Sequence, residues 1–378
     1  MTEKLGNYSE PALNRYLHGR ARRLGIPLAG NFELTPCCNL QCRMCYVRKD
    51  ASEVGDRLLP ADQWLDWGEE AVRAGMLFLL LTGGEPLTHP QFREIYLGLK
   101  KMGLMVSVNT NGTLINEEMA DFLAAEAPAR VNLSLYGASP ETYERLCGSG
   151  AAYEKAVRAI ELLLARGVHV KLNYSATPSN AADLPEIFRF ADEHRIRVQT
   201  TAYMFPAIRR GRVFEQDDRF SAEQAGCFQY RTDALRYPPD RLRERTKAIR
   251  AGAALPDPDS ECMDQPQEPI SCRAGRTSFW MTWDGMMRPC GMMTEPSADA
   301  KSLGFSQAWQ AVREAAQHIV MPAKCAQCGA RSLCPVCPAA CLAENGAFGS
   351  APHYLCEMTA AYLRQYQLSE PSDSRKEE

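Results

Sequence analysis

The sequence predicts an α/β protein built around a partial (β/α)6 barrel of the TIM type, followed by a cysteine-rich region. Short β-rich runs recur along the first half of the chain, near residues 31–35, 77–82, 104–109, 130–136, 168–175 and 197–204. Amphipathic helical stretches, such as residues 62–75 and 151–167, separate these runs. Strands that alternate with helices form a parallel sheet with right-handed crossovers. Six such units occupy about 170 residues, which suits an incomplete barrel better than the ~250 residues of a closed eightfold one.

The composition limits the classes of function. The 378 residues include 43 basic and 46 acidic side chains, so the formal charge is −3 and no nucleic-acid partner is expected. The most apolar run, residues 76–81, is far shorter than the roughly 18 residues of a membrane span, and no secretory signal precedes it. We therefore expect a cytoplasmic protein without membrane association. In that reducing compartment, 15 cysteines at short spacings indicate metal or redox chemistry rather than disulfides.

The pattern of the chain changes after the sixth strand run. The expected divisions are an N-terminal extension, the barrel, a connector with a charged helix near residues 221–250, a cysteine-rich domain and a disordered tail, at residues 1–30, 31–205, 206–261, 262–360 and 361–378. Residues 262–356 hold nine cysteines in 95 positions, with too few long periodic elements for a conventional core. We expect bound metal to hold this part together.

Three cysteines lie on the loop that follows the first predicted strand. Cys38, Cys42 and Cys45 have the spacing CxxxCxxC, which places three thiolates on one loop and leaves one iron of a [4Fe–4S] cluster open. The same spacing is one face of a helix, but Pro36 and the polar neighbours do not describe a buried helical stripe. A zinc site with three thiolates and a water is the stronger alternative, although no histidine lies on this loop.

Polar and glycine-rich segments follow three further strands. They are "TGGEP" at residues 82–86, "NTNG" at 109–112 and "SLYG" at 134–137. The carboxyl ends of parallel strands meet at one edge of the sheet, and that edge holds the active site in such folds.

CxxxCxxC followed by an aromatic residue resembles the signature of radical S-adenosylmethionine (SAM) enzymes. The resemblance implies that SAM chelates the open iron and that the glycine-rich segment contacts its methionine part, where a backbone without Cβ permits close approach. Glu85 would accept a hydrogen bond from the SAM ammonium. The expected cofactor contacts are Tyr46, Gly83, Gly84, Glu85, Pro86, Asn109, Asn111, Ser134 and Tyr136. Taken alone, "TGGEP" is a plain turn and the others are strand-end caps.

The C-terminal cysteines resemble those of a SPASM domain. Residues 272–290 fit Cx12Gx4C, and residues 325–334 fit CxxCx5C. The resemblance implies two auxiliary [4Fe–4S] clusters, a distal one on Cys325, Cys328, Cys334 and Cys356 and a proximal one on Cys262, Cys272 and Cys290. Pro338 stands where the family has a further cysteine, so either Cys337 or Cys341 completes the proximal set. A zinc ribbon is the alternative for such CxxC motifs.

The resemblance implies an enzyme that reductively cleaves SAM to a 5′-deoxyadenosyl radical and abstracts hydrogen from a peptide or protein. An external electron donor of the flavodoxin or ferredoxin type is implied. No residue is singled out as catalytic. Sulfatase maturases carry an aspartate where this chain has Gly291, so a maturase that forms thioether or carbon–carbon crosslinks in a ribosomally made peptide is the first choice. Maturation of a sulfatase or dehydrogenase is the second, and a non-enzymatic iron–sulfur or zinc protein the third. The short N-terminal extension predicts that a separate protein or the barrel rim binds any leader peptide.

Overall fold

The computed structural model describes residues 12–209, 218–252 and 272–369. One nine-stranded sheet, in the order β6-β5-β4-β3-β2-β1-β7-β8-β9, runs through these residues. Its strands are β1 (Ala29–Glu33), β2 (Phe78–Thr82), β3 (Met105–Thr110), β4 (Arg130–Ser134), β5 (Val170–Ser175), β6 (Arg197–Thr201), β7 (Ser278–Met281), β8 (Met286–Arg288) and β9 (Ala298–Asp299). The first six strands are parallel neighbours in chain order, which confirms the predicted partial barrel.

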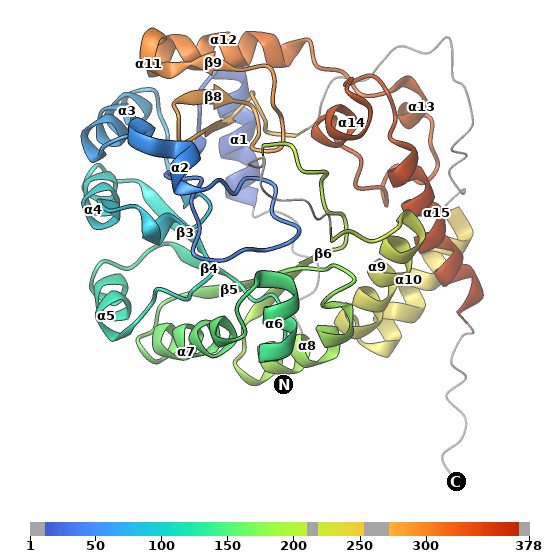
Figure 1. Cartoon of the computed structure of the whole chain (residues 1–378). Helices are drawn as coiled ribbons and strands as arrows, with labels where there is room; N and C mark the ends of the chain where they lie inside the picture. Colours follow the sequence, from blue (N-terminus) through green and yellow to red (C-terminus); the bar gives the residue numbers. More distant parts are fainter. Residues whose placement is uncertain (1–11, 210–217, 253–271, 370–378) are drawn as a thin grey trace.

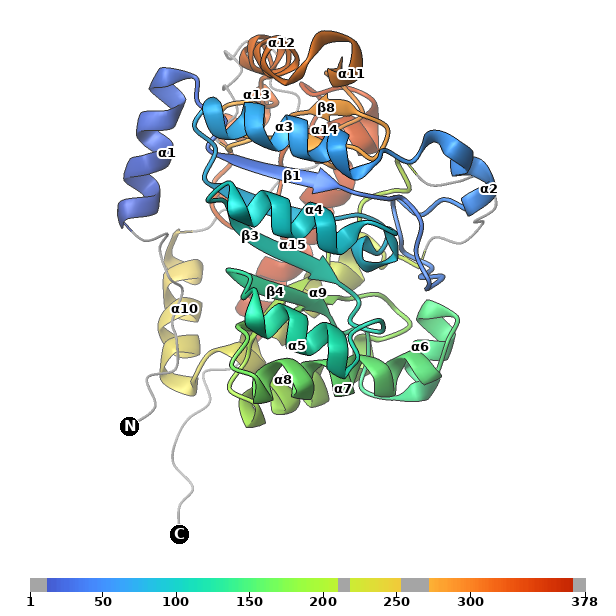
Figure 2. The ribbon, with the colours of Figure 1, turned by 90° about the vertical axis from the view of Figure 1, so that its left-hand side faces the viewer.

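Helices cover the outer face of this parallel sheet (Figures 1 and 2). They are α3 (Ala61–Arg73), α4 (Phe92–Lys101), α5 (Glu117–Ala125), α7 (Ala151–Ala165) and α8 (Leu184–Glu193). Alternate strand residues such as Val131, Leu133 and Leu172 are buried in the apolar core on that side. The residues between them are mostly polar and point to the opposite, inner face, because successive side chains of a strand alternate between faces.

The sheet continues into the cysteine-rich region. β7 pairs in parallel with β1, and β8 and β9 follow in antiparallel order. Phe279 of β7 packs 6.2 Å from Phe32 and 5.1 Å from Phe305, measured between ring centroids. Phe305 begins α12 (Phe305–Gln317), which follows the short helix α11 (Ala300–Leu303). The expectation that this region lacks a conventional core is therefore wrong, because buried residues from Phe279 to Met358 share the barrel's core.

Beyond α12 the elements become short until the last helix. α13 (Ala323–Ala326) and α14 (Pro338–Asn345) carry or adjoin most of the remaining cysteines, and α15 (His353–Leu368) ends the described chain. The predicted tail begins too early, because Tyr362, Leu363 and Tyr366 of α15 are buried. The hydroxyl of Tyr366 donates to Asp233 at 2.7 Å, which fixes the end of α15 to α9.

The connector contains two helices rather than one. α9 (Ala222–Arg236) packs along α15, and α10 (Pro239–Gly252) follows it (Figure 1). Pro238 and Pro239 separate them, because proline lacks a backbone N–H and disfavours helix in the residue before it. The remaining helices are α1 (Ala12–Leu24), α2 (Ala51–Val54) and α6 (Pro140–Cys147). No helix within the described ranges has the length and apolar character needed to cross a membrane.

Candidate radical SAM site

The loop with Cys38, Cys42 and Cys45 leaves the carboxyl end of β1, toward which the β1 arrow points in Figure 2. Its backbone is fixed by hydrogen bonds to α6, from Gln41 N to the Cys147 carbonyl at 2.8 Å and from Arg43 N to the Leu146 carbonyl at 2.9 Å. The loop therefore has a defined shape set by the protein chain.

The "TGGEP" segment clamps the start of this loop. Gly84 N donates to the Thr35 carbonyl at 2.7 Å, and Glu85 N donates to the Cys37 carbonyl at 2.8 Å. A Cβ atom at Gly83 would lie 2.4 Å from the Thr35 oxygen, and one at Gly84 would lie 2.3 Å from the Cys37 oxygen. Both glycines are required by the close approach of two backbone segments, a reason within the protein that the sequence did not reveal.

Glu85 is fully buried and joins the loops after β2 and β3. Its Oε1 accepts from Leu87 N at 3.1 Å and from the Thr110 hydroxyl at 2.8 Å, while Oε2 accepts from Asn111 N at 2.7 Å. Burial raises the pKa of this carboxyl to about 7, although the three donors oppose that shift. Pro86 follows as the first residue of the short 3-10 helix η2 (Pro86–Thr88), which Glu85 caps. Contact between Glu85 and the SAM ammonium stays a prediction.

The two asparagines after β3 have different partners. Asn111 is buried, and its Nδ2 donates to Asn39 Oδ1 at 2.9 Å and lies 3.7 Å from Cys38 Sγ. It therefore holds the cysteine loop. Asn109 Oδ1 instead accepts from Asn132 Nδ2 at 2.8 Å on the inner face of the sheet. Asn132 was not among the predicted residues, because an asparagine in mid-strand carries no motif.

Ser134 and Tyr136 lie close to the same loop. Burial raises the pKa of the Tyr136 phenol, and the nearby thiols of Cys42 and Cys147 raise it further, while a hydrogen bond with Ser134 opposes the shift. The structure thus brings the predicted residues after β1, β2, β3 and β4 to one edge of the sheet. Their contacts with SAM stay predictions.

The three loop thiols offer a donor set that suits a [4Fe–4S] cluster. Burial and the neighbouring Cys42 raise the pKa of Cys38, so thiolates here require a compensating cation. Leu40 N approaches Cys38 Sγ and Arg48 N approaches Cys45 Sγ, both at 3.4 Å. Backbone N–H groups directed at sulfur stabilise cluster thiolates. Across the described ranges, no three His, Cys, Asp or Glu side chains converge as one metal ion would require. A cubane [4Fe–4S] cluster does not require such convergence, because each thiolate binds a separate iron.

A fourth thiol, that of Cys147 in α6, touches this set. A hydrogen bond with Cys147 is the largest cause of the raised pKa of Cys42, ahead of burial. Cys147 is completely buried. The sequence offered no signal for it, because it lies alone in a helical stretch outside the CxxxCxxC spacing.

A buried ion pair connects the cysteine loop to the C-terminal region, and we name it the Glu33–Arg209 bridge. The Arg209 guanidinium binds both carboxylate oxygens of Glu33, at 2.9 and 2.8 Å, and its Nε donates to the Gly291 carbonyl at 3.1 Å. Trp280 Nε1 also donates to Glu33, at 2.8 Å. The guanidinium lies 5.8 Å from the ring centroid of Tyr46, the residue after Cys45. The partners are 176 residues apart in the sequence, which shows no sign of the pair.

The C-terminal cysteines form two neighbouring sets. The pKa of Cys290 is raised to about 11, mainly by burial and also by the charges of Cys337 and Cys272, so these two thiols lie near Cys290. Cys337 directly precedes α14 and is its N-cap residue. Cys262, predicted to join this proximal set, lies outside the described residues.

The distal set is centred on Cys325. Burial raises the pKa of Cys325 to about 11, with further contributions from Cys334, Cys356 and Cys328. Cys341 lies inside α14, is completely buried, and has Cys325 as its strongest thiol neighbour. The predicted distal cysteines are thus brought together. Of the two candidates for the proximal set, Cys337 is the one that lies beside Cys290.

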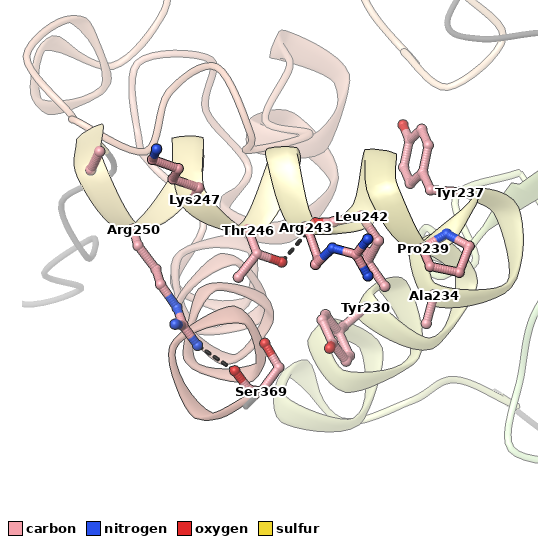
Figure 3. Close-up of a pocket in the computed structure, with 11 residues that line it drawn as sticks. Tyr230, Ala234, Tyr237, Pro239, Leu242, Arg243, Thr246, Lys247, Arg250 and Ser369 are labelled. Atoms are coloured by element: carbon pink, nitrogen blue, oxygen red, sulfur yellow. Dashed lines mark hydrogen bonds between the residues drawn. The ribbon is translucent and has the colours of Figure 1, made fainter. Parts of the chain in front are cut away.

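A separate groove of about 760 Å³ lies away from these cysteines, between α9, α10 and the end of α15 (Figure 3). Its described lining combines aromatic and apolar side chains with three cations and includes no cysteine. The lining residues include Tyr230, Tyr237, Leu242, Arg243, Lys247 and Arg250. Arg250 is occupied in capping α15, since its Nε donates to the Tyr366 carbonyl at 2.9 Å.

Comparisons with known proteins agree with this arrangement. Residues 32–191 match the radical SAM superfamily. The AdoMet-dependent heme synthase of Methanosarcina barkeri is 25% identical over 331 residues, which cover 83% of this chain and 92% of that protein. The mycofactocin maturase MftC of Mycobacterium ulcerans is 30% identical over 219 residues, 58% of this chain. The chain spans 57% of the length of that maturase.

Two solved structures share the fold over most of the chain. SuiB of Streptococcus suis bound to S-adenosylmethionine superposes with a TM-score of 0.62 at 17% identity, covering 94% of this chain and 83% of SuiB. The enzyme anSMEcpe with bound AdoMet has a TM-score of 0.62 at 16% identity, covering 90% of this chain and 97% of that one. The superfamily match spans β1 to α8, including the CxxxCxxC loop and the strand ends that meet it. The similarity to the radical SAM superfamily therefore lies in the segment that forms the candidate site.

Proposed function

We propose that the chain is a radical SAM enzyme that modifies a peptide or protein and that its C-terminal region is of the SPASM type. Cys38, Cys42 and Cys45 would hold the SAM-binding [4Fe–4S] cluster. The observation that carries the proposal is the grouping of the later cysteines into two sets in a region that extends the barrel's own sheet. Mycofactocin maturases among the relatives, and the SuiB structure bound to its precursor peptide SuiA among the fold neighbours, support a peptide substrate.

The two C-terminal sets would hold two auxiliary clusters, giving three clusters and about twelve irons per chain. The distal ligands would be Cys325, Cys328, Cys334 and Cys356. The proximal ligands would be Cys272, Cys290 and Cys337, with Cys262 as the predicted fourth. We assign Cys337 rather than Cys341 because Cys337 contributes to the raised pKa of Cys290.

The bound cluster and SAM together supply a radical that abstracts hydrogen from a substrate C–H bond. The protein's contribution is to fix the site and to exclude water. The loop bonds to α6 and to the "TGGEP" segment hold the three thiols in place. The Glu33–Arg209 bridge fixes this loop against the segment that carries Cys290.

The first choice among reactions is crosslinking of a ribosomally made peptide rather than sulfatase maturation. A Cβ atom at Gly291 would lie 2.7 Å from the ring of Trp280, whose indole is held by Glu33. The aspartate that sulfatase maturases carry at this position therefore does not fit beside Trp280. This packing supports the inference that the reaction does not use an aspartate at position 291 as its base.

A tetrapyrrole-modifying activity is the second candidate. The observation that favours it is the length of the match to the heme synthase of M. barkeri, which covers 92% of that protein. We further propose a cytoplasmic location, an electron donor of the flavodoxin or ferredoxin type, and a separate protein for leader recognition.

The test is an anaerobic reaction of the reconstituted full-length protein with SAM and a chemical reductant. One arm contains the small peptides encoded beside the gene, and the other contains iron-coproporphyrin III. Mass spectrometry should show 5′-deoxyadenosine together with a peptide that has lost two hydrogens per crosslink. Modified porphyrin with unchanged peptides would favour the second candidate. Absence of 5′-deoxyadenosine, with Cys42→Ala as the blank, would contradict both.

A further inference from the structure

Three cations lie side by side on the inner face of the open end of the barrel. Lys171 of β5 is the register partner of Asn132 in β4 and of Arg197 in β6. Arg130 lies two residues before Asn132 and therefore on the same face of the sheet. The opposite face of these strands is buried against the helices through Val131, Leu133 and Leu172. We name Arg130, Lys171 and Arg197 the inner cation set.

Neutral amides hold two of these cations in place. Arg130 Nε donates to Asn132 Oδ1 at 2.7 Å, and Lys171 Nζ donates to Gln199 Oε1 at 2.6 Å. Among the described residues, none of the three forms a salt bridge. Arg130 and Lys171 are half-buried, whereas Arg197 is exposed at the sheet edge. The set therefore combines partial desolvation with unneutralised positive charge.

The three cations repel one another. The pKa of Lys171 is lowered to about 8, mainly by burial and also by the charges of Arg130 and Arg197. The pKa of Arg130 is lowered by burial and by Arg197. Like charges held together in this way are stabilised by an anion, and a carboxylate or phosphate would accept charge-assisted hydrogen bonds from all three.

The inner cation set lies on the same sheet as the candidate radical SAM site. Lys171 lies four residues before the last residue of β5, so it is ~13 Å along the strand from the edge where the cysteine loop lies. Asn132, which accepts a hydrogen bond from Arg130, also donates to Asn109, its register partner in β3. A substrate held at one end by this set would extend along the inner face toward the strand ends.

We propose that the inner cation set is a substrate-anchoring site that binds a carboxylate of the molecule to be modified. The inference rests on the proposed function and adds that the substrate is acidic: a peptide with a glutamate or aspartate a few residues from the modified position, or a tetrapyrrole with propionates. Both carry the same chemistry, so the experiment separates them.

The test uses the reactivity of the Lys171 amine in the full-length protein, without SAM or reductant. At pH 8 an amine with a pKa of about 8 is half uncharged, whereas an ordinary lysine with a pKa of ~10.4 is under ~1% uncharged. Acetylation by an N-hydroxysuccinimide ester, followed by peptide mass spectrometry, should label Lys171 fastest. Saturating N-acetyl-tetraglutamate amide or coproporphyrin III should slow this labelling about ten-fold by restoring the ammonium form.

Controls make the outcome decisive. N-acetyl-tetraglutamine amide should give no protection, and Lys155 on the outer helix α7 should label at the same rate with every probe. Arg197→Gln, at an exposed position, should slow Lys171 labelling without a ligand and weaken binding of the protecting probe about ten-fold. Whichever acidic probe protects identifies the source of the carboxylate.

Two results would overturn the proposal: equal protection by glutamate and glutamine peptides, or protection by inorganic phosphate equal to that by both carboxylate probes. The labelling needs no turnover. It therefore tests the anchoring site even if the proposed peptide modification fails. Conversely, the turnover assay can succeed while the labelling shows no anchoring, so the two failures are distinguishable.

Discussion

The cysteine loop after β1 and the cysteines beyond α12 are both rich in thiols, but the protein holds them differently. Gln41, Gly84 and Glu85 connect the first loop or its base to distant segments through backbone hydrogen bonds. Beyond Ala323 the backbone bonds are mostly local turns, such as Arg331 N to the Cys328 carbonyl at 2.9 Å. The loop after β1 therefore has a shape set by the protein chain, whereas we expect the region beyond Ala323 to depend on the proposed auxiliary clusters for its order.

Loss of one SAM-cluster ligand should have the largest effect. Cys42→Ala removes one of three thiolates, so the cluster site is left incomplete and 5′-deoxyadenosine formation should fall below detection. Cys37→Ala is the matched control, because it lies on the same loop outside the spacing and keeps its backbone bond to Glu85. Liquid chromatography of anaerobic reactions measures the product. A native rate in Cys42→Ala would contradict the assignment.

Removal of the distal ligands should separate the two regions. Cys328→Ala/Cys334→Ala should lose about four irons and substrate modification, yet still cleave SAM, because the backbone hydrogen bonds described for the loop after β1 go to other segments. Iron analysis, 5′-deoxyadenosine and modified substrate are measured together, with Cys227→Ala in α9 as the control. Full modification by the double variant would show that these cysteines do not hold a working cluster.

Removal of all iron with a chelator should show the same difference between the barrel and the region beyond α12 without any mutation. In apo protein, amide hydrogen exchange should rise in residues 323–352 while β1 to β5 stay protected, because the strands are held by the hydrogen bonds of the sheet whereas residues 323–352 make mostly local turns. The readout is exchange mass spectrometry before and after iron removal. Equal loss of protection in both regions would contradict the comparison.

The Glu33–Arg209 bridge should affect both regions at once. Arg209→Met leaves Glu33 buried without its cation, which costs about 3–5 kcal/mol of the free energy of unfolding for a buried pair broken on one side. Urea denaturation measures this cost. The double variant Glu33→Gln/Arg209→Met should recover part of it, and a double variant that is no more stable than Arg209→Met would mean that the pair itself contributes little.

Glu85 should affect both the structure of the loops and the binding of SAM. Its carboxylate accepts three hydrogen bonds within the protein, so Glu85→Ala should loosen the loops after β2 and β3 as well as weaken SAM binding by roughly ten- to a hundred-fold. Titration with SAM measures the affinity and iron analysis the cluster content. If the SAM affinity and the cluster content were both unchanged, Glu85 would neither bind SAM nor hold the cysteine loop.

The sequence predicted the parts of the molecule that depend on local pattern. Strand and helix periodicity located β1 to β6 within a few residues, and cysteine spacing identified the loop of Cys38. It could not predict the Glu33–Arg209 bridge or the Asn109–Asn132 pair, since those contacts depend on strand register and on segments far apart in the chain. The buried end of α15 was missed because Tyr362 and Tyr366 gain their burial only by packing near α9 and α10.

The smallest expected effect concerns the inner cation set and is seen in the pH dependence of stability. The pKa of Lys171 is about 8 in the folded protein against 10.5 for an ordinary lysine. As the pH falls from about 10.5 to about 8, the unfolded chain gains a proton that the folded chain does not, so this residue lowers the stability of the fold over that range. Lys171→Gln lacks this proton, and its free energy of unfolding relative to wild type should rise across the same window. Urea unfolding of the apo proteins at several pH values measures the difference, with Lys155→Gln as control. Parallel curves for wild type and Lys171→Gln would show that Lys171 has an ordinary pKa and that the cations do not repel one another.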